Sequence, residues 1–276
     1  MSDLTRVNGE KSHSLDVMDR GLCYGDGLFE TIKVFQNKPL LLDAHFSRLA
    51  LGCERLGIAF DGLKDRFKAD ISDLLALNPH SLAVLKLTVT RGAGPRGYFA
   101  ANNLRPTTIS SLSIAPDFTH KAVEGVVLRW CQTPLSINPL LAGIKHLNRL
   151  EQVLARKEWD TADISEGLMK DADGFLIEGT MSNIFWIEQG RLYTPELDRS
   201  GVAGVLRGAV IDMAARQNNP VLTGRFTEIV LNKAEEVFIC NSLIDIWPVR
   251  KLEAMEWQIG PQTRRLQALL KEEYSV

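Results

Sequence analysis

The chain has 276 residues, which is enough for two domains of ordinary size. Hydrophobic residues make up 45% and charged residues 24%, a balance typical of soluble globular proteins. The net charge of -2 argues against a nucleic-acid partner or an anionic membrane surface, and no apolar run is long enough to span a bilayer. The cysteines and histidines are scattered without metal-ligand spacing and the N-terminus is polar, so we expect no metal site and a cytoplasmic protein with reduced thiols.

Strands and helices alternate in the first half of the chain. A helix is expected from Asp43, a good N-cap, to Gly57, a good stop. Its apolar face would consist of Phe46, Leu49, Ala50, Cys53 and Leu56. The other expected elements are two strands within residues 28–42 around a turn at Gln36-Asn37-Lys38, a helix over 64–77, and strands over 83–90 and 107–114.

The second half contains a helix that we expect to begin with a capping box formed by Asn148 and Glu151 and to reach about Trp159. Its buried stripe would consist of Leu150, Val153 and Leu154. The other expected elements are strands over 125–130, 167–170, 175–178, 183–187, 191–194 and 235–240, a tight turn over 171–174, and a helix over 204–216.

This order of elements predicts an α+β fold of two domains. The turn-rich stretch Ala115–His120 is the best boundary between them. We expect a smaller N-terminal α/β domain over 1–115, an interdomain linker over 116–124 and a larger domain over 125–276, with a ligand site between the domains.

Lys145 lies in the apolar segment Leu141-Ala142-Gly143-Ile144-Lys145-His146-Leu147, directly before an expected helix. Apolar surroundings disfavour the ammonium form of a lysine, so the neutral amine becomes available. A neutral amine can form a Schiff base with a carbonyl compound such as pyridoxal phosphate. The alternative is a surface lysine whose stem packs while its charge stays in water, and local sequence alone favours that alternative because most lysines are exposed.

The segment Gly92-Ala93-Gly94-Pro95-Arg96-Gly97 has the spacing G-x-G-x-x-G and follows an expected strand. A dinucleotide site needs a helix to begin inside this motif, and Pro95 and the non-amphipathic sequence after it argue against one. The segment is better interpreted as a flexible loop that carries Arg91, Arg96 and Tyr98, in which Arg96 can bind a carboxylate through two hydrogen bonds. An ordinary surface turn is the alternative.

Two features of the sequence suit an anion such as a phosphate. Residues 200–207 run from a Gly-rich loop into a helix, where the N–H groups of Val205 and Leu206 and the helix dipole favour negative charge. Arg48, which lies off the apolar face of its helix, can add positive charge, and Asn241 at a strand end can supply a further donor.

Glu178 follows Leu176-Ile177 at a strand end. A carboxylate buried there is costly unless it has a partner. A protonated pyridine nitrogen would be such a partner, and its protonation makes a pyridoxal cofactor a strong electron sink. The alternative is an exposed glutamate.

Taken in order, these segments resemble the fold-type IV pyridoxal-phosphate enzymes, which include branched-chain aminotransferases, D-amino-acid aminotransferases and aminodeoxychorismate lyases. The resemblance extends over almost the whole chain. Its segments are 19–31 (DRGLCYGDGLFET), 45–49 (HFSRL), 91–98 (RGAGPRGY), 143–151 (GIKHLNRLE), 178–185 (EGTMSNIF), 201–207 and 240–241. The segments Ile144–Arg149 and Arg91–Tyr98 are most similar to those of the lyases.

The resemblance implies pyridoxal 5'-phosphate as the cofactor, held between the two domains, and it implies a role for each matching residue. Lys145 would carry the cofactor and move protons, and Glu178 would pair with the pyridine nitrogen. The phosphate would be bound by Arg48, Val205, Leu206 and Asn241. Candidate substrate contacts are Thr31, Arg96, Tyr98, Asn148 and Arg149.

Two positions depart from the transaminase pattern. Family transaminases often place a tyrosine shortly after the lysine to contact the ring hydroxyl, where this chain has Arg149-Leu150. Thr31 replaces the glycine that is common after Phe-Glu in branched-chain aminotransferases. These departures leave the contact to the ring hydroxyl unassigned and indicate a differently shaped site.

The activity implied by the resemblance is elimination of pyruvate from 4-amino-4-deoxychorismate to give 4-aminobenzoate, a step in folate biosynthesis, by a homodimer. A D-amino-acid or branched-chain aminotransferase of the same fold is the main alternative. A binding protein that has kept the fold without catalysis, and a nucleotide-dependent enzyme built on Gly92–Gly97, are more distant alternatives.

Overall fold

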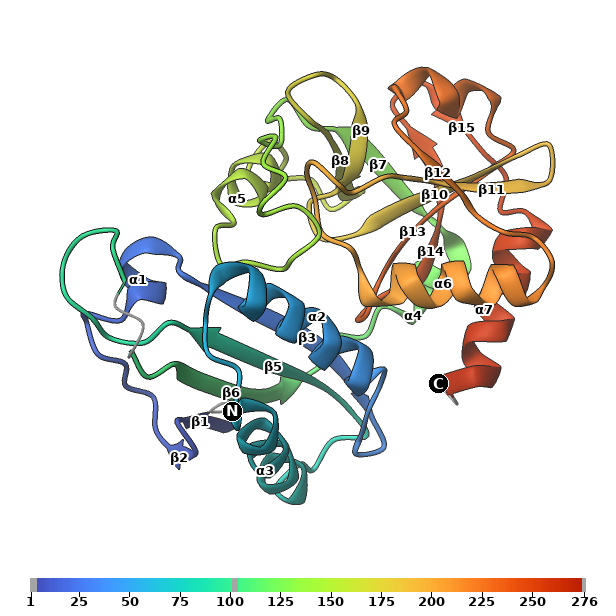
Figure 1. Cartoon of the computed structure of the whole chain (residues 1–276). Coiled ribbons are helices and arrows are strands. Elements are labelled where there is room, and N and C mark those ends of the chain that lie inside the picture. The colour runs from blue at the N-terminus through green and yellow to red at the C-terminus, as the bar shows by residue number, and fades with distance from the viewer. Residues whose placement is uncertain (1–3, 101–103, 275–276) are drawn as a thin grey trace. The chain divides into compact units, whose positions relative to one another are not determined.

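The computed structural model describes residues 4–100 and 104–274, and the chain divides into two compact units (Figure 1). Unit 1 consists of Met1–Pro116 together with Ile144–Asn148, and unit 2 consists of Asp117–Gly143 and Arg149–Val276. The short segment 144–148 therefore packs with the N-terminal part of the chain, although its neighbours in sequence belong to unit 2. Helix α4 (Thr119–Glu124) occupies most of the stretch that the sequence predicts as a linker.

Unit 1 is an antiparallel sheet with helices packed on it, in the strand order β2-β1-β6-β5-β3-β4. Helix α2 packs on β3 and helix α3 on β6, and their Phe46 and Phe67 rings lie 6.4 Å apart. The elements of unit 1 are β1 (Leu4–Val7), β2 (Glu10–Lys11), α1 (Arg20–Tyr24), β3 (Gly27–Phe35), β4 (Lys38–Pro39), α2 (Leu42–Leu56), α3 (Leu63–Ala76), β5 (Leu82–Thr90) and β6 (Thr107–Ile114).

Helix α2 confirms the expected helix but begins one residue before Asp43. Its N-cap is Leu41, with a left-handed φ of 55°. Asp43 lies in the first turn, where its negative charge interacts favourably with the helix dipole. Gly57 ends the helix as predicted, with a φ of 65° that suits glycine. On the predicted apolar face, Phe46, Leu49 and Cys53 are buried, whereas Ala50 and Leu56 are half-buried.

The expected hairpin of residues 28–42 is present but its second strand is short. Gln36 and Asn37 have φ values of 48° and 59°, as a tight turn with both central residues left-handed requires. After Pro39 the chain leaves β4 and enters α2 through Leu41, so the prediction of a strand up to residue 42 was wrong.

Unit 2 is built on a mixed sheet in the order β12-β11-β10-β13-β14-β7-β8-β9, with β15 paired to β14. Helices α4, α6 and α7 pack against β13 and β14 (Figure 1). The Trp186 and Trp247 side chains lie in the core of this unit. The elements of unit 2, besides α4, are β7 (Val126–Trp130), α5 (Leu150–Arg156), β8 (Ile164–Lys170), β9 (Leu176–Gly179), β10 (Asn183–Glu188), β11 (Arg191–Pro195), α6 (Val205–Arg216), β12 (Leu222–Gly224), the 3₁₀ helix η1 (Glu228–Lys233), β13 (Glu236–Asn241), β14 (Asp245–Leu252), β15 (Met255–Glu256) and α7 (Pro261–Tyr274).

Helix α5 differs from its prediction at both ends and on its face. It begins at Leu150 with Arg149 as N-cap, and it ends at Arg156 rather than near Trp159. The predicted capping box is wrong, because Asn148 donates to the Gly25 carbonyl and Glu151 accepts from Ser136. The predicted buried stripe is also wrong: Leu150 is 75% exposed and Leu154 is 54% exposed.

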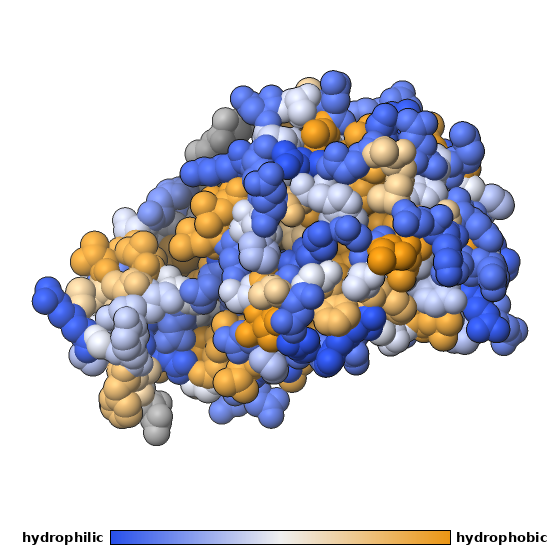
Figure 2. Space-filling view, turned by 90° about the horizontal axis from the view of Figure 1, so that it is seen from above, coloured by the Kyte–Doolittle hydropathy of each residue, from blue (hydrophilic) through white to orange (hydrophobic). Residues whose placement is uncertain are grey.

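On the face shown in Figure 2, apolar side chains are exposed among polar and charged ones. The most exposed large apolar side chains of the chain include Val17, Leu22, Tyr98, Phe99, Leu140, Leu150 and Ile229. Among residues 4–100 and 104–274, none of the helices has the length and apolar character needed to cross a bilayer.

Gly52 sets how closely α2 approaches β3, since a Cβ there would lie 2.7 Å from a methyl group of the buried Leu28. We predict that Gly52→Ala lowers the free energy of unfolding by about 1–3 kcal/mol through overpacking. The control is Gly208→Ala on α6, where a Cβ would meet no atom within 4 Å and the better helix propensity of alanine should add about 0.5–1 kcal/mol. Urea unfolding of both variants tests this, and a stabilised Gly52→Ala variant would contradict it.

Candidate active site

Lys145 is held in unit 1 by its backbone. Its carbonyl accepts from the Phe29 N–H at 2.9 Å, and the Leu147 N–H donates to the Gly27 carbonyl at 2.9 Å. Residues 145–147 thus form a short antiparallel bridge to the beginning of β3, centred on Leu28 and His146. The Lys145 amine lies 4.5 Å from the centre of the Phe29 ring. The lysine is half-buried beside an aromatic ring, as its apolar sequence context suggests.

The two faces of β3 carry different chemistry. Successive side chains of a strand point to opposite faces, so Phe29 and Thr31 share one face while Leu28, Glu30 and Ile32 share the other. The predicted substrate residue Thr31 therefore lies on the same face of the sheet as the ring beneath the Lys145 amine. Glu30 lies on the face that packs against α2.

Glu30 is a carboxylate in the core of unit 1, only 1% exposed, and α2 supplies its partners. Arg48 donates to it twice, from Nε to Oε1 at 2.9 Å and from Nη2 to Oε2 at 2.5 Å. The Nδ1 atom of His45 lies 2.6 Å from Oε2. The predicted phosphate-binding arginine is therefore fixed in place by a buried acid that the sequence did not single out.

Arg48 and His45 stabilise the ionised form of Glu30. Burial alone would raise the pKa of Glu30, but the Arg48 charge and the hydrogen bond from His45 outweigh it, and the pKa lies below the ordinary 4.5. Burial lowers the pKa of His45 despite the adjacent Glu30 carboxylate. His45 is thus neutral with its proton on Nδ1, and its buried Nε2 has no hydrogen-bond partner among the described residues.

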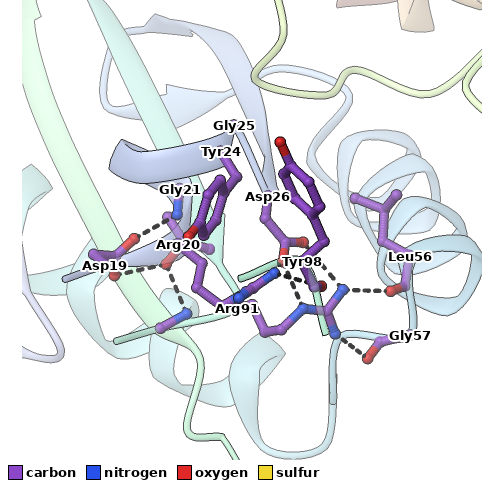
Figure 3. Close-up of polar contacts among 12 residues, drawn as sticks. Asp19, Arg20, Gly21, Tyr24, Gly25, Asp26, Leu56, Gly57, Arg91 and Tyr98 are labelled. Atoms are coloured by element: carbon purple, nitrogen blue, oxygen red, sulfur yellow. Dashed lines mark hydrogen bonds and ion pairs between the residues drawn. The ribbon is translucent and has the colours of Figure 1, made fainter. Parts of the chain in front are cut away.

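The backbone of the loop that carries Arg96 and Tyr98 is hydrogen-bonded to Arg20 of α1 (Figure 3). Arg20 donates to the Gly97 carbonyl at 2.8 Å and to the Tyr98 carbonyl at 3.0 Å, and its guanidinium lies 4.8 Å from the centre of the Tyr24 ring. The Tyr24 hydroxyl in turn accepts from the Gly97 N–H at 3.0 Å. The side chains of Arg96 and Tyr98 themselves are exposed, so the loop backbone is fixed while these two side chains face solvent.

Arg91 has a structural role beside this loop. It donates from Nε to Asp26 Oδ2 at 2.7 Å and from Nη2 to the Leu56 carbonyl at 2.6 Å (Figure 3). Burial opposes ionisation of Asp26, but Arg91 and Arg20 outweigh it and hold the pKa of Asp26 below its ordinary value. No helix begins within Gly92–Gly97, so the segment lacks the helix start that a dinucleotide site requires.

Glu178 lies in unit 2 on β9 and is 5% exposed, so it is a buried carboxylate rather than a surface one. Its Oε2 accepts from the Val202 N–H at 2.9 Å and from Asn183 Nδ2 at 3.3 Å. Asn183 is itself held by the Val202 carbonyl at 2.9 Å. These donors favour the ionised carboxylate, which is the form that pairs with a protonated ring nitrogen.

The start of α6 has the character that the sequence predicts for an anion site. Gly204 is its N-cap and makes no side-chain cap, so the backbone N–H groups of Val205 and Leu206, in the first turn of α6, have no acceptor within the helix itself. A Cβ at Gly204 would lie 2.0 Å from Asn183 Oδ1, so the close approach of α6 to β10 requires glycine. Burial lowers the pKa of Arg207 in the first turn of α6, while the nearby Glu178 carboxylate opposes this.

The remaining predicted residues have their own partners. Asn241, at the end of β13, donates to the Met181 carbonyl at 2.9 Å and accepts from the Leu243 and Ile244 N–H groups. Asn148 donates to the Gly25 carbonyl at 3.2 Å, and Arg149 is the N-cap of α5. Asn241 is therefore already engaged in holding the turn that follows Glu178.

The predicted residues thus fall into two groups. Unit 1 carries Lys145, Arg48, Thr31, Arg96, Tyr98 and Asn148, and unit 2 carries Glu178, Val205, Leu206, Asn241 and Arg149. Sequence reasoning did not identify Glu30, His45 and Asn183. Glu30 could have been identified, because it lies between Leu28 and Ile32 on the side of an alternating strand that is expected to be buried.

The sequence matches a known protein family. Residues 27–252 match the family model for amino-transferase class IV. The chain is 37% identical over 269 residues to an aminodeoxychorismate lyase of Vibrio harveyi, covering 96% of this chain and 98% of that protein. It is 30% identical over 268 residues to a putative branched-chain-amino-acid aminotransferase of Methanocaldococcus jannaschii, covering 95% and 92%.

Among solved structures, the chain is similar to 4-amino-4-deoxychorismate lyase from Pseudomonas aeruginosa, with a TM-score of 0.94 and 43% identity over 99% of this chain and 100% of that one. The match confirms the predicted two-domain α+β architecture of fold type IV.

The neutral His45 makes stability depend on pH. Since its pKa is lowered from 6.5 in the folded state, the unfolded chain binds a proton that the folded chain does not, and stability should fall as the pH drops below 6.5. We predict that His45→Asn, whose side-chain amide can replace Nδ1 as the donor to Glu30, removes this part of the pH dependence. Denaturant midpoints at about pH 7.5 and 5.5 test it, a range in which Glu30 stays ionised. Equal losses in both proteins would contradict the assignment.

Proposed function

The chain belongs to the amino-transferase class IV family, and we propose that within this family it is a pyridoxal-phosphate lyase that converts 4-amino-4-deoxychorismate to 4-aminobenzoate and pyruvate. The observation that carries the choice of reaction is the order of similarity. The two most similar of the relatives reported above are both named as lyases and are 37% and 43% identical to the chain, whereas the reported aminotransferase relative is 30% identical.

The residues on both units fit pyridoxal 5'-phosphate. The set offers an amine for the aldehyde, an arginine and an uncapped helix start for the phosphate, and a buried carboxylate for the ring nitrogen. Gly204 and Gly201 allow the backbone to pack closely against Asn183 and Glu178, because a Cβ would lie 2.0 Å from Asn183 Oδ1 in the first case and 3.1 Å from Glu178 Cδ in the second. When bound, the cofactor supplies an electron sink that stabilises negative charge at the substrate carbon being deprotonated.

We assign the cofactor contacts as follows. Lys145 binds the aldehyde carbon, Arg48 and the N–H groups of Val205 and Leu206 bind the phosphate, and Glu178 holds the proton on the ring nitrogen. The hydrogen bonds that Arg48 donates to Glu30 hold its side chain in one orientation, which reduces the entropy lost when it binds phosphate. Asn241 contributes through the turn at Met181 that its amide holds.

Lys145 is the proton carrier of the proposed reaction. As a neutral amine it removes the proton from C4 of the substrate, the carbon–oxygen bond at C3 then breaks, and the enolpyruvyl group leaves. A proton delivered to the methylene carbon of that group gives pyruvate, so one proton is taken and one is returned. The six-membered ring becomes aromatic, which drives the step forward.

The substrate has two carboxylates, and the loop arginine and the helix-cap arginine are the residues assigned to them. Arg96 is exposed on a loop whose backbone Arg20 fixes, so its guanidinium can reach a ligand without reordering the loop. Arg149 is the second candidate, and Tyr98, Asn148 and Thr31 are assigned to the rest of the substrate. This set supports a dianionic substrate over a small amino acid with one carboxylate.

We further propose that the protein is a cytoplasmic homodimer. The support is the exposed apolar stripe of α5, where Leu150, Val153 and Leu154 are 75%, 47% and 54% exposed at helical spacing. An apolar stripe of this kind on a polar surface marks an association site. A second copy of the chain is the partner that this proposal assigns to it.

Lys145→Ala should abolish production of 4-aminobenzoate from 4-amino-4-deoxychorismate, by at least about 10³-fold, because it removes both the covalent link and the proton carrier. Borohydride reduction should attach the cofactor to Lys145 in the wild type and not in the variant. Attachment at another lysine, or substantial activity in the variant, would refute the assignment. Wild-type protein that takes up no cofactor would favour the binding-protein alternative.

An aminotransferase of the same fold remains the second candidate, supported by the 30% identity to the Methanocaldococcus jannaschii relative. The two activities are separated by incubating the loaded protein with D-alanine, L-leucine or 4-amino-4-deoxychorismate. Rapid conversion of the cofactor to its pyridoxamine form by an amino acid, with no 4-aminobenzoate from the third substrate, would establish the transaminase instead.

The dimer can be tested by sedimentation of the wild type beside Leu154→Glu and, as control, Ile229→Glu. Ile229 is 65% exposed on η1 and lies outside the α5 stripe. We predict that Leu154→Glu weakens the dimer at least about tenfold, since burying an unpaired charge at an interface costs more than 1.4 kcal/mol, while Ile229→Glu leaves it unchanged. A monomeric wild type, or equal effects of both substitutions, would contradict the proposed interface.

A further inference from the structure

Glu166 is a buried acid that the proposed reaction does not use. It lies on β8 and has no exposed surface. A carboxylate in such a place is costly unless donors surround it. Its neighbours are therefore informative about what the residue does.

Both oxygens of Glu166 are occupied by donors from one short segment and from its own strand. Oε1 accepts from the Gly167 N–H at 2.9 Å, the Thr180 N–H at 3.1 Å and the Thr180 hydroxyl at 2.5 Å. Oε2 accepts from the Met181 N–H at 3.1 Å and the Ser182 hydroxyl at 2.9 Å. These five groups all donate, and the two oxygens of one carboxyl side chain together have the acceptor positions to receive them.

The segment held in this way is a closed turn. The Gly179 N–H donates to the Ser182 carbonyl at 2.7 Å, and the Thr180 N–H also contacts the Gly167 carbonyl at 3.0 Å. A Cβ on Gly179 would lie 2.4 Å from Ser182 Oγ and 3.0 Å from Glu166 Cδ. The turn is thus folded tightly over the Glu166 carboxylate, with no space for a side chain at its first residue.

The two ends of the turn carry the proposed cofactor partner and its support. Glu178 directly precedes the turn, and Asn183, which donates to Glu178 at 3.3 Å, directly follows it. The Met181 carbonyl, in the middle of the turn, accepts from Asn241 at 2.9 Å. The path of the turn therefore determines where Glu178 and Asn183 lie and which way they point.

We propose that Glu166 is a positioning residue: its carboxylate fixes the turn of residues 179–182 and, through that turn, aims Glu178 at the ring nitrogen of the cofactor. The inference rests on the proposed function for the identity of the ligand. Burial raises the pKa of Glu166, although hydrogen bonds from Thr180, Gly167, Ser182 and Met181 oppose this. The five donors give the residue its positioning role whatever ligand Glu178 meets.

Glu166→Gln is the informative substitution because it keeps the shape and replaces one acceptor oxygen by an NH2 group. That group would face either the Thr180 donors or the Met181 and Ser182 donors, so the turn must rearrange. A matched control is Glu236→Gln. Glu236 is also buried in unit 2 and accepts from the Gln262 N–H at 3.0 Å and from the Thr263 N–H and hydroxyl at 2.7 and 2.6 Å, but it caps α7.

The experiment measures pyridoxal-phosphate binding to the cofactor-free proteins and the pH dependence of the bound cofactor's absorbance. We expect Glu166→Gln to weaken binding at least about tenfold, as loss of a residue that orients a direct ligand commonly does. It should also shift the pH midpoint of the absorbance in the same direction as Glu178→Gln does. Glu236→Gln should lower thermal stability and leave both the affinity and the pH midpoint at their wild-type values.

Hydrogen exchange of the cofactor-free proteins adds a readout that needs no ligand. The amides of Thr180 and Met181 should lose protection in Glu166→Gln and keep it in Glu236→Gln. Should Glu166→Gln fail to fold, the double variant Thr180→Val, Ser182→Ala removes both hydroxyl donors while keeping the carboxylate. It should weaken cofactor binding at least about threefold, in line with the loss of hydrogen bonds to a charged group.

The outcomes separate this inference from the proposed function. A wild-type protein that binds no pyridoxal phosphate would overturn the proposed function. A wild type that binds it, beside a folded Glu166→Gln or double variant with unchanged affinity and pH midpoint, would overturn the inference alone. Equal losses of affinity in Glu166→Gln and Glu236→Gln would also overturn it, since the effect would then belong to any buried carboxylate.

Discussion

Burying a carboxylate is costly unless hydrogen-bond donors reach it, and this requirement organises the site residues of both units. Glu30 on β3 is hydrogen-bonded to His45 and Arg48 of α2. Glu166 accepts from the turn after β9, and Glu178 accepts from the backbone N–H of Val202. In each case a strand acid and a segment distant in sequence become one rigid assembly. The functional groups are therefore positioned by the same bonds that make the buried acids tolerable.

Periodicity predicted the regular elements well, because it depends on local sequence. The strand over 107–114 and the helix over 64–77 differ from β6 and α3 by at most one residue at either end. Helix α5 shows where periodicity stops being informative. Its apolar residues do recur at helical spacing, but spacing identifies a stripe without saying what covers it, and in this chain Leu150 and Leu154 are exposed.

The site was only partly predictable for a related reason. Lys145 and Glu178 could be selected as candidates because each lies in or beside an apolar stretch and because their motifs occur in a known order. The hydrogen-bond partners of the site residues could not be predicted, because they lie far apart in the sequence. Asn148 has the sequence of a helix cap, yet it donates to the Gly25 carbonyl, 123 residues away. Thr180 reaches Glu166 across 14 residues. No local pattern encodes such pairings, whereas the buried phase of Glu30 on its strand could have been recognised.

The proposed function needs some groups to stay fixed and one group to move, and the structure holds the two kinds differently. Glu178, the proposed ring partner, would work only if its direction is constant, and hydrogen bonds from the Val202 N–H and Asn183 Nδ2 restrain it. A proton carrier must instead reach more than one atom in turn. Lys145 is held through its carbonyl and through the neighbouring Leu147 N–H, both bonded to the backbone at the start of β3. Because these anchors do not involve the side chain, the amine can change its bonding during a reaction cycle without disturbing the strand bridge that places it.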